Sequence, residues 1–215
     1  PGFHTSLTEE EFIQAVNQVG LSVIGQTAQI AKADKILYAL RNVTATVDNV
    51  SLISASIMSK KLASGSDAIV LDVKCGDGAF MEDLPHAIEL AELMVDIGKQ
   101  AGKQMAALIT DMSQPLGYAV GNALEVQEAI QVLRGEGPAD ITDLSRQLAS
   151  YMVFLGGKAA SPEEALVLVD QAWKSGAALE KLSQFIAIQG GNPGVIQNPG
   201  LFPQPDWSFD LVSQK

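Results

Sequence analysis

Two short, almost continuously apolar segments, Ala68–Val73 and Met105–Thr110, constrain the fold more than any other feature of the sequence. Strands that are covered on both faces, as in parallel sheets, have this composition. Between them, Leu84–Ala101 carries apolar residues at helical spacing and is long enough for a crossover helix. The order strand, helix, strand therefore predicts an α/β fold, in which helices cover a parallel mixed sheet.

Further elements are predicted from apolar spacing and from capping residues. Ser6–Glu9 has the pattern of a capping box that opens a helix, and Leu21–Ile24 is an apolar run typical of a short strand. The other predicted helices cover residues 34–40, 48–64, 123–133, 141–155, 162–175 and 177–188. Residues 190–215 hold four prolines and little periodicity, so we expect an irregular tail there.

The composition argues against several classes of protein. The chain has 215 residues and a net charge of −11, and an acidic chain without Lys/Arg clusters does not suit nucleic acid. Its longest apolar runs are far shorter than the ~20 residues that span a bilayer, so we expect no membrane partner. A single cysteine, Cys75, cannot form an internal disulfide and indicates a cytoplasmic location.

Four residues of two neighbouring predicted helices form the first candidate site. Tyr38 and Arg41 are three residues apart and Ser56 and Lys60 are four apart, so each pair lies on one helix face. If the helices pack as a hairpin, two cations, a hydroxyl and an aromatic ring converge. This set suits a flat heterocycle, because the cations donate to its carbonyl oxygens and the serine accepts from its N–H. Spacing alone favours the simpler interpretation that both cations are solvated helix ends.

The second candidate is the glycine-bearing loop within Asp72–Phe80, at the carboxyl end of the first strand. Ligands of open α/β sheets bind outside such strand ends, and glycine lets the backbone approach them closely. The glycine spacing matches neither the P-loop nor the dinucleotide fingerprint. A plain strand-to-helix turn explains the segment equally well.

The third candidate is Asp111–Glu128, where an irregular Pro-Leu-Gly turn leads into a helix that carries Glu125 and Glu128. Backbone carbonyls with one carboxylate suit a hard, weakly hydrated cation. Acidic residues in a first turn also stabilise a helix without any ion, and the residues alone favour that interpretation.

Covalent catalysis is disfavoured, and we assign no catalytic residue within this chain. Cys75 has no neighbouring His or Asn to activate it, and no serine lies in a G-x-S-x-G elbow. The two histidines, His4 and His86, match no zinc-binding spacing.

The amino-acid sequences of the three candidate sites are more distinctive of a protein family than the spacing of their polar residues. Residues 37–48 (LYALRNVTATVD) resemble the LYALRDVTATVD stretch of pyrimidine-nucleoside and thymidine phosphorylases, and residues 54–61 (SASIMSKK) follow at that family's interval. Residues 72–81 (DVKCGDGAFM) resemble DVKTGSGAFM, and residues 111–126 (DMSQPLGYAVGNALEV) resemble the broad-specificity bacterial branch. Asn42 and Cys75 depart from the family's usual Asp and Thr.

This resemblance implies phosphorolysis, in which phosphate attacks the anomeric carbon of uridine, thymidine or deoxyuridine and releases the base and a (deoxy)ribose 1-phosphate. Inorganic phosphate is then the co-substrate. The resemblance assigns pyrimidine binding to Tyr38, Arg41, Ser56 and Lys60. It assigns a structural potassium ion to the backbone oxygens of Leu116 and Ala119 and the carboxylate of Glu128.

The resemblance also implies a domain organisation. Residues 1–33 and 67–190 belong to an α/β domain, residues 34–66 form a helical hairpin of a separate small base-binding α domain, and residues 191–215 form an irregular tail or a linker to a C-terminal subdomain. A homodimer through the helical domain is implied. The family's phosphate-binding loop precedes the segment that begins at Pro1. We therefore expect a fragment that needs an N-terminal polypeptide of the same enzyme for activity.

Two alternatives stay open. A phosphoribosyltransferase of the anthranilate type shares the general architecture, although the segments TATVD (residues 44–48) and SIMSKK (residues 56–61) argue against it. A non-catalytic fragment or assembly partner becomes the better interpretation if no upstream polypeptide accompanies the chain.

Overall fold

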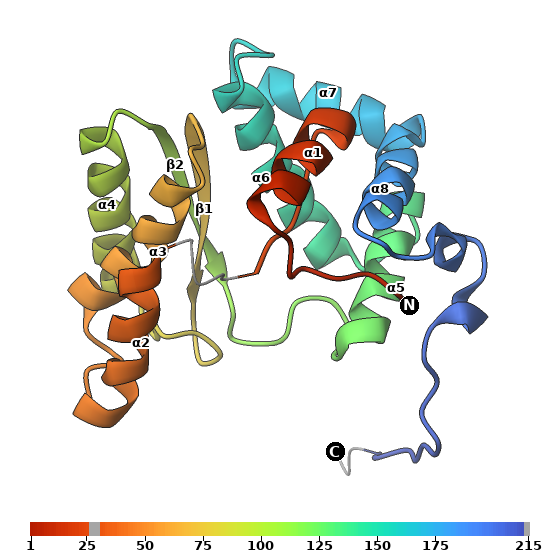
Figure 1. Ribbon diagram of the computed structural model, residues 1–215, viewed down its shortest axis with the longest axis horizontal. Coiled ribbons are helices and arrows are strands. Elements are labelled where there is room, and N and C mark those ends of the chain that lie inside the picture. The colour runs from red at the N-terminus through yellow and green to blue at the C-terminus, as the bar shows by residue number, and fades with distance from the viewer. Residues whose placement is uncertain (26–30, 213–215) are drawn as a thin grey trace.

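A computed structural model describes residues 1–25 and 31–212, and its elements form two groups (Figure 1). The first group contains α2 (Lys32–Thr44), α3 (Val50–Ala63), β1 (Ala68–Cys75), α4 (Leu84–Gln100) and β2 (Gln104–Asp111). The second contains α1 (Glu9–Val19), α5 (Asn122–Arg134), α6 (Ala139–Leu155), α7 (Pro162–Lys174) and α8 (Ala177–Ile188). Among the described residues, no helix has the length and apolar character needed to cross a membrane.

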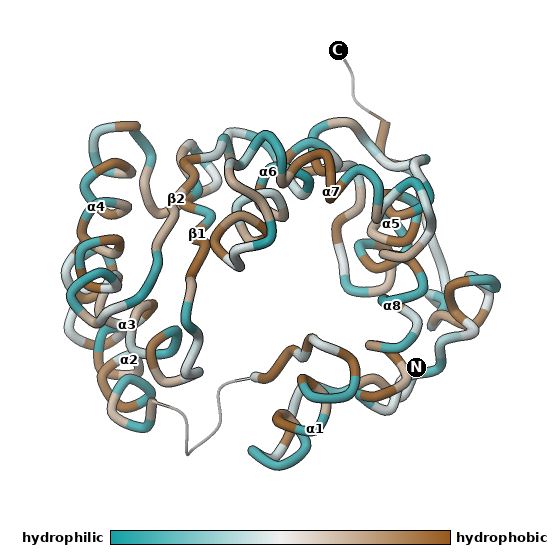
Figure 2. Tube along the Cα trace, turned by 90° about the horizontal axis from the view of Figure 1, so that it is seen from above, coloured by the Kyte–Doolittle hydropathy of each residue, from teal (hydrophilic) through white to brown (hydrophobic). Residues whose placement is uncertain are grey.

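The two strands confirm the predicted α/β fold. β1 and β2 pair in parallel, from Ala68 opposite Gln104 to Cys75 opposite Asp111, and α4 is the crossover between them. The strands lie between α4 and α6 (Figure 2), so helices cover both faces. This double coverage explains why both strand sequences are almost continuously apolar.

The main core lies on the α4 side of the sheet. Alternate residues of β1, namely Ile69, Leu71 and Val73, are at most 6% exposed. They form one cluster with buried residues of α3 and α4: Ile53, Met58, Ala87, Leu90, Ala91 and Met94. Packing in this cluster fixes α3 against the sheet, and α3 in turn carries one half of the first candidate site.

The predicted strand over Leu21–Ile24 is wrong. The segment is not in a strand, because the side chain of Gln189 takes the place of a neighbouring strand. Its Oε1 accepts from the Val23 N–H at 2.8 Å, and its Nε2 donates to the Val23 carbonyl at 2.9 Å. Nε2 also donates to the His4 carbonyl at 2.9 Å, and Ser22 Oγ donates to Oε1 at 3.3 Å.

The capping box of α1 is Thr8 with Glu11, and the prediction that Ser6 caps the helix is wrong. Glu11 N donates to Thr8 Oγ1 at 3.2 Å, while Thr8 N donates to a Glu11 carboxylate oxygen at 2.7 Å. Both positions fit the capping pattern in sequence. The later start leaves Leu7 outside the helix, where it is only 6% exposed, and gathers three carboxylates in the first turn.

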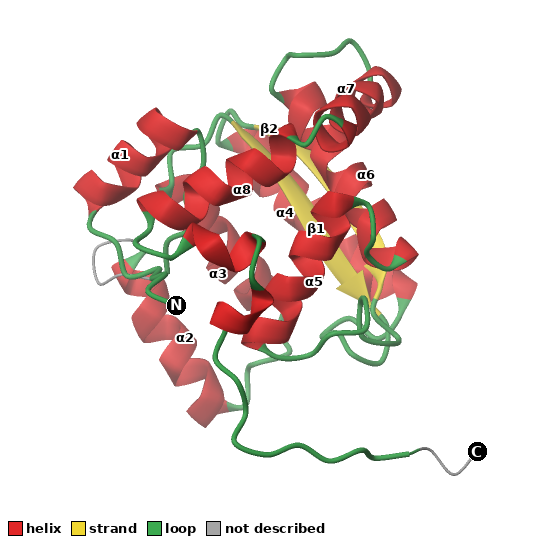
Figure 3. Cartoon of the chain, turned by 90° about the vertical axis from the view of Figure 1, so that its right-hand side faces the viewer, coloured by secondary structure: helices red, strands yellow, loops and turns green. Residues whose placement is uncertain are grey.

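The first part of the predicted tail packs against the second group. Two 3-10 turns, Pro193–Ile196 and Pro199–Leu201, follow α8. Val195, Ile196 and Phe202 are buried there against residues of α5 and α8. Beyond them, residues 203–212 run away from the helices (Figure 3).

We predict that Gln189→Ala lowers the free energy of unfolding by about 2–4 kcal/mol, because it removes three hydrogen bonds that the buried carboxamide makes to the backbone of His4 and Val23. Gln189 is only 1% exposed. Urea denaturation of the chain measures the change. Gln184→Ala is the matched control, since Gln184 is an exposed glutamine of α8, the helix that Gln189 caps. Equal unfolding free energies for the two variants would contradict the prediction.

Candidate functional site

The loop that joins α2 to α3 is held by Arg41 and by a helix cap. The Arg41 side chain is 7% exposed, and its guanidinium donates to the carbonyl oxygens of Thr46 and Val47. Asn49 caps α3 by accepting from Leu52 N at 3.0 Å. These bonds fold the predicted helices back on each other as a hairpin, which was the condition for the predicted residues to converge.

The hairpin brings Lys60 and Ser56 together with a third residue from α2. Lys60 Nζ donates to Ser56 Oγ at 2.9 Å and to Asp34 Oδ2 at 2.8 Å. Ser56 and Asp34 are 6% and 7% exposed, whereas the Lys60 side chain is 30% exposed. The cation therefore sits at the rim of a polar cluster with its partners inside.

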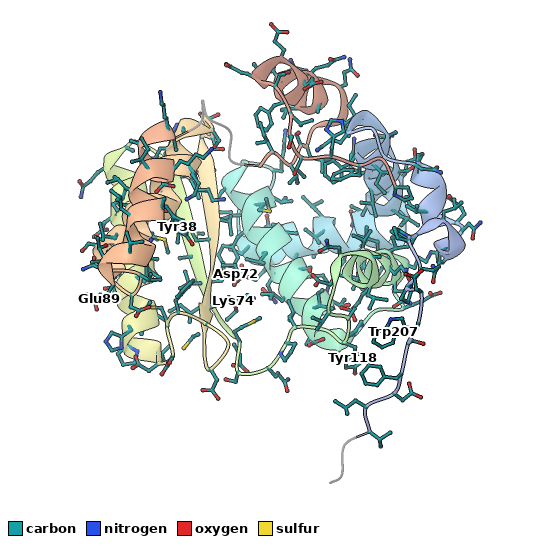
Figure 4. All side chains as sticks on the ribbon, turned by 60° about the horizontal axis from the view of Figure 1, so that its bottom comes forward. Tyr38, Asp72, Lys74, Glu89, Tyr118 and Trp207 are labelled. Atoms are coloured by element: carbon teal, nitrogen blue, oxygen red, sulfur yellow. The ribbon has the colours of Figure 1, made fainter. Side chains whose placement is uncertain are left out.

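Tyr38, which is labelled on the hairpin in Figure 4, completes the cluster. The Arg41 guanidinium carbon lies 5.3 Å from the centre of its ring, and Lys60 Nζ lies 5.9 Å from it. Tyr38 is 47% exposed, so part of this cluster is open to solvent. All four residues predicted for pyrimidine binding thus lie together, while their role stays a prediction.

Asp34 was missed as a site residue by the sequence predictions. Burial acts to raise the pKa of its carboxyl group, but hydrogen bonds from Lys60 and Ser56 and the charges of Lys60 and Arg41 outweigh burial and lower this pKa. Asp34 is therefore an anion at neutral pH. A signal was present in the sequence, because Asp34, Tyr38 and Arg41 recur at intervals of four and three along one helix face.

The glycine loop after β1 lies against the end of β2. Gly78 N donates to the Met112 carbonyl at 2.9 Å, and a side-chain carbon at Gly78 would lie 2.6 Å from that oxygen. Glycine is thus required by close approach of the backbone. A cavity of about 490 Å³ lies between this loop, β1, α3 and α4.

Charged side chains at the end of the sheet are paired with one another. Lys74 Nζ lies 2.8 Å from Asp72 Oδ2 and 3.1 Å from Thr110 Oγ1. Thr110 donates to the other Asp72 oxygen at 2.5 Å. Asp72 and Lys74 lie beside each other on β1, away from Tyr38 (Figure 4).

The proposed potassium ligands lie around the turn before α5. Glu128 is 6% exposed, and its Oε1 accepts from the N–H groups of Tyr118 and Ala119 at 2.8 and 3.1 Å. Within the described part of the chain, neither the Leu116 nor the Ala119 carbonyl oxygen accepts a hydrogen bond. One buried carboxylate with two uncommitted carbonyls fits a hard monovalent cation.

Other metal chemistry finds no support in residues 1–25 and 31–212, where no three His, Cys, Asp or Glu side chains are grouped to hold an ion. Glu125 stabilises the start of α5 without any ion, as the simpler interpretation of this segment has it. Its Oε1 accepts from the Gly121 N–H at 2.8 Å. Cys75 is a free thiol that packs against the core. His86 pairs with Asp83, whose hydrogen bond raises the pKa of the imidazole.

The glycosyl transferase family, a/b domain, matches residues 1–179. The chain belongs to this family. It is 53% identical to a pyrimidine-nucleoside phosphorylase of Geobacillus stearothermophilus over 215 residues, which are all of this chain and 50% of that protein. Over 214 residues it is 50% identical to the pyrimidine-nucleoside phosphorylase of Bacillus subtilis and 51% identical to that of Staphylococcus aureus, and it covers 49% of each.

These similarities confirm the resemblance drawn from the sequence motifs. The chain spans about half the length of the curated relatives it matches. The match to the family covers α1 to α7 and both strands, and therefore includes the hairpin, the glycine loop and the turn before α5.

We predict that Asp34 stabilises the folded chain in a pH-dependent way. Its pKa is lowered from 3.8 in the folded state, so its contribution is complete well above pH 3.8 and is lost as the pH falls through the folded-state pKa. Asp34→Asn should lower the free energy of unfolding by about 1–3 kcal/mol at pH 6. Urea denaturation between pH 6 and pH 3 should show this difference shrinking.

The control is Asp206→Asn, which removes an exposed carboxylate outside the helices. It should leave the unfolding free energy unchanged across the same pH range. A pH-independent difference for Asp34→Asn would show that the lost charge is not the cause.

Proposed function

We propose that this chain supplies the pyrimidine-binding half of a pyrimidine-nucleoside phosphorylase. Phosphate attacks the anomeric carbon of uridine, thymidine or deoxyuridine, the C–N bond breaks, and the base leaves with its electron pair. The observation that carries the proposal is the convergence of Arg41, Ser56 and Lys60 beside Tyr38 in one hairpin. The names and the identity of the relatives support the same reaction class.

The two cations act on the leaving group. As the bond breaks, negative charge spreads onto the base carbonyl oxygens, and fixed N–H donors stabilise that charge more than the neutral substrate. Arg41 has five N–H donors, and its bonds to Thr46 and Val47 leave donors for a carbonyl oxygen of the base. Lys60 serves a carbonyl with the donor that Asp34 and Ser56 do not take.

Ser56 orients the base. Its hydroxyl oxygen has two lone pairs, of which Lys60 takes one. The second lone pair accepts from the pyrimidine N–H, between the two carbonyls that the cations hold. Tyr38 lends the face of its half-exposed ring to the flat heterocycle.

We further propose potassium as a structural ion bound by Leu116, Ala119 and Glu128. When bound, it supplies positive charge that complements the buried Glu128 carboxylate and the two backbone oxygens. Glu128 itself ties the turn to α5 through the Tyr118 and Ala119 N–H groups, and Asp140 of α6 accepts from Gly117 N at 2.9 Å. Hydrogen bonds to residues of two helices thus hold the loop in one conformation.

The assembly is part of the same proposal. The inorganic phosphate is held by a polypeptide that corresponds to the rest of the relatives' length, which this chain does not match. A homodimer forms through α2, where Ile36, Leu37, Leu40 and Val43 are between 49% and 79% exposed. The unpaired Cys75 supports a cytoplasmic location.

The central test is phosphorolysis of uridine and thymidine by a full-length chimera that joins this chain to the rest of the G. stearothermophilus relative. Arg41→Ala and Lys60→Ala should each lower kcat/KM by roughly 100-fold or more, because each removes a leaving-group donor. Ser56→Ala should weaken base binding by about 1–3 kcal/mol. Lys61→Ala, which alters the neighbouring lysine, is the control; unchanged kcat/KM in the Arg41 and Lys60 variants would refute the proposal.

Potassium binding is tested on the chain itself. We predict a higher melting temperature in potassium chloride than in tetramethylammonium chloride at equal ionic strength, because oxygen ligands coordinate potassium but not an ion covered by methyl groups, and a bound ion stabilises the folded state. Glu128→Gln should abolish this difference, whereas Glu125→Gln should preserve it. The same melting temperature in both salts would argue against the site.

A further inference from the structure

Asp34 stands at the centre of the hairpin although the assigned pyrimidine ligands do not include it. Its Oδ2 lies 2.8 Å from Lys60 Nζ, and its side chain is 7% exposed. The same ammonium donates to Ser56 Oγ at 2.9 Å. A lysine ammonium has three donors, so Asp34 and Ser56 take two of them inside the hairpin and leave the third for a ligand at the exposed rim.

The two cations of the site are fixed in different ways. Arg41 is anchored by the backbone carbonyls of Thr46 and Val47 and has a planar, preorganised fork of donors. Lys60 carries a point charge on a flexible four-carbon stem, and within the described residues its ammonium donates to Asp34 and Ser56. Asp34 therefore does for the lysine what the backbone carbonyls do for the arginine.

The net charge of the cluster also supports a role for Asp34 in holding Lys60. Arg41 and Lys60 contribute two positive charges around the Tyr38 ring, and Asp34 contributes one negative charge behind them. One net positive charge remains, which balances the single negative charge of a departing pyrimidine. The acid lies deeper than the lysine, so it opposes the cation without facing the open side of the site.

We infer that Asp34 is a positioning residue for pyrimidine release: it holds the Lys60 ammonium against Ser56 so that the remaining N–H is presented to a base carbonyl oxygen. This inference rests on the proposed function. Asp34 acts through Lys60 and contacts no reacting atom. Fixing the ammonium before the base arrives removes the ordering of a flexible side chain from the activation step.

The test uses the full-length chimera with uridine and with 5-fluorouridine, whose base is the better leaving group. Asp34→Asn keeps the shape and removes the charge, and should lower kcat/KM for uridine roughly 10- to 100-fold, mainly through kcat. The loss should be smaller with 5-fluorouridine, which depends less on Lys60. Asp34→Glu restores the charge and should recover part of the rate.

A double-mutant cycle separates positioning from a general structural role. In a Lys60→Ala background, Asp34→Asn should cost no further activity, because the group through which it acts is gone. Asp170→Asn is the matched control: Asp170 forms a comparable partly buried ion pair with Arg146, outside the hairpin. This control should keep the kcat/KM of the unsubstituted chimera.

The outcomes distinguish the positioning role of Asp34 from the proposed function of the chain. Normal activity of Asp34→Asn, an equal loss with both nucleosides, or a loss that persists without Lys60 would overturn the positioning role and leave the proposed function standing. Absence of phosphorolysis by the unsubstituted chimera would overturn the proposed function and this inference with it.

Discussion

The burial of α3 on two sides is the constraint on which the rest of the site depends. Towards β1 and α4, Met58 is 1% exposed and joins the main apolar cluster with Ile53. Burying one such side chain contributes about 1.5–3 kcal/mol. Towards α2, the same helix presents Ser56 and Lys60. Because the sheet fixes the helix on one side, the polar side is held in one orientation without any contribution from a ligand.

The hairpin also shows how an acidic protein can gather positive charge at one place. The chain carries a net charge of −11, so its overall field repels anions. Locally the balance is reversed, since Arg41 and Lys60 lie beside one ring and a single acid faces them. At short range a pair of fixed donors outweighs the diffuse charge of the surface, which salt screens within about 10 Å.

The sequence predicted the elements whose signals are local. Both strands were found because double coverage makes them continuously apolar, and the helices because their apolar spacing and caps lie within the helices themselves. The hairpin residues were found by spacing and by family resemblance. Asp34 was missed because its significance comes from a partner on another helix, 26 residues away. The start of α1 was misplaced because two overlapping capping patterns compete, and burial of Leu7 decides between them.

The false strand at Leu21–Ile24 has the same origin, since the partner of Val23 is a side chain 166 residues away. At neutral pH only a carboxamide carries a donor nitrogen and an acceptor oxygen on one carbon atom, and that of asparagine is one methylene shorter. A single residue at the end of the last α-helix therefore holds the first residues of the chain in place through hydrogen bonds to their backbone. Its chemistry leaves little freedom of substitution at position 189, even though that position lies far from the hairpin in sequence.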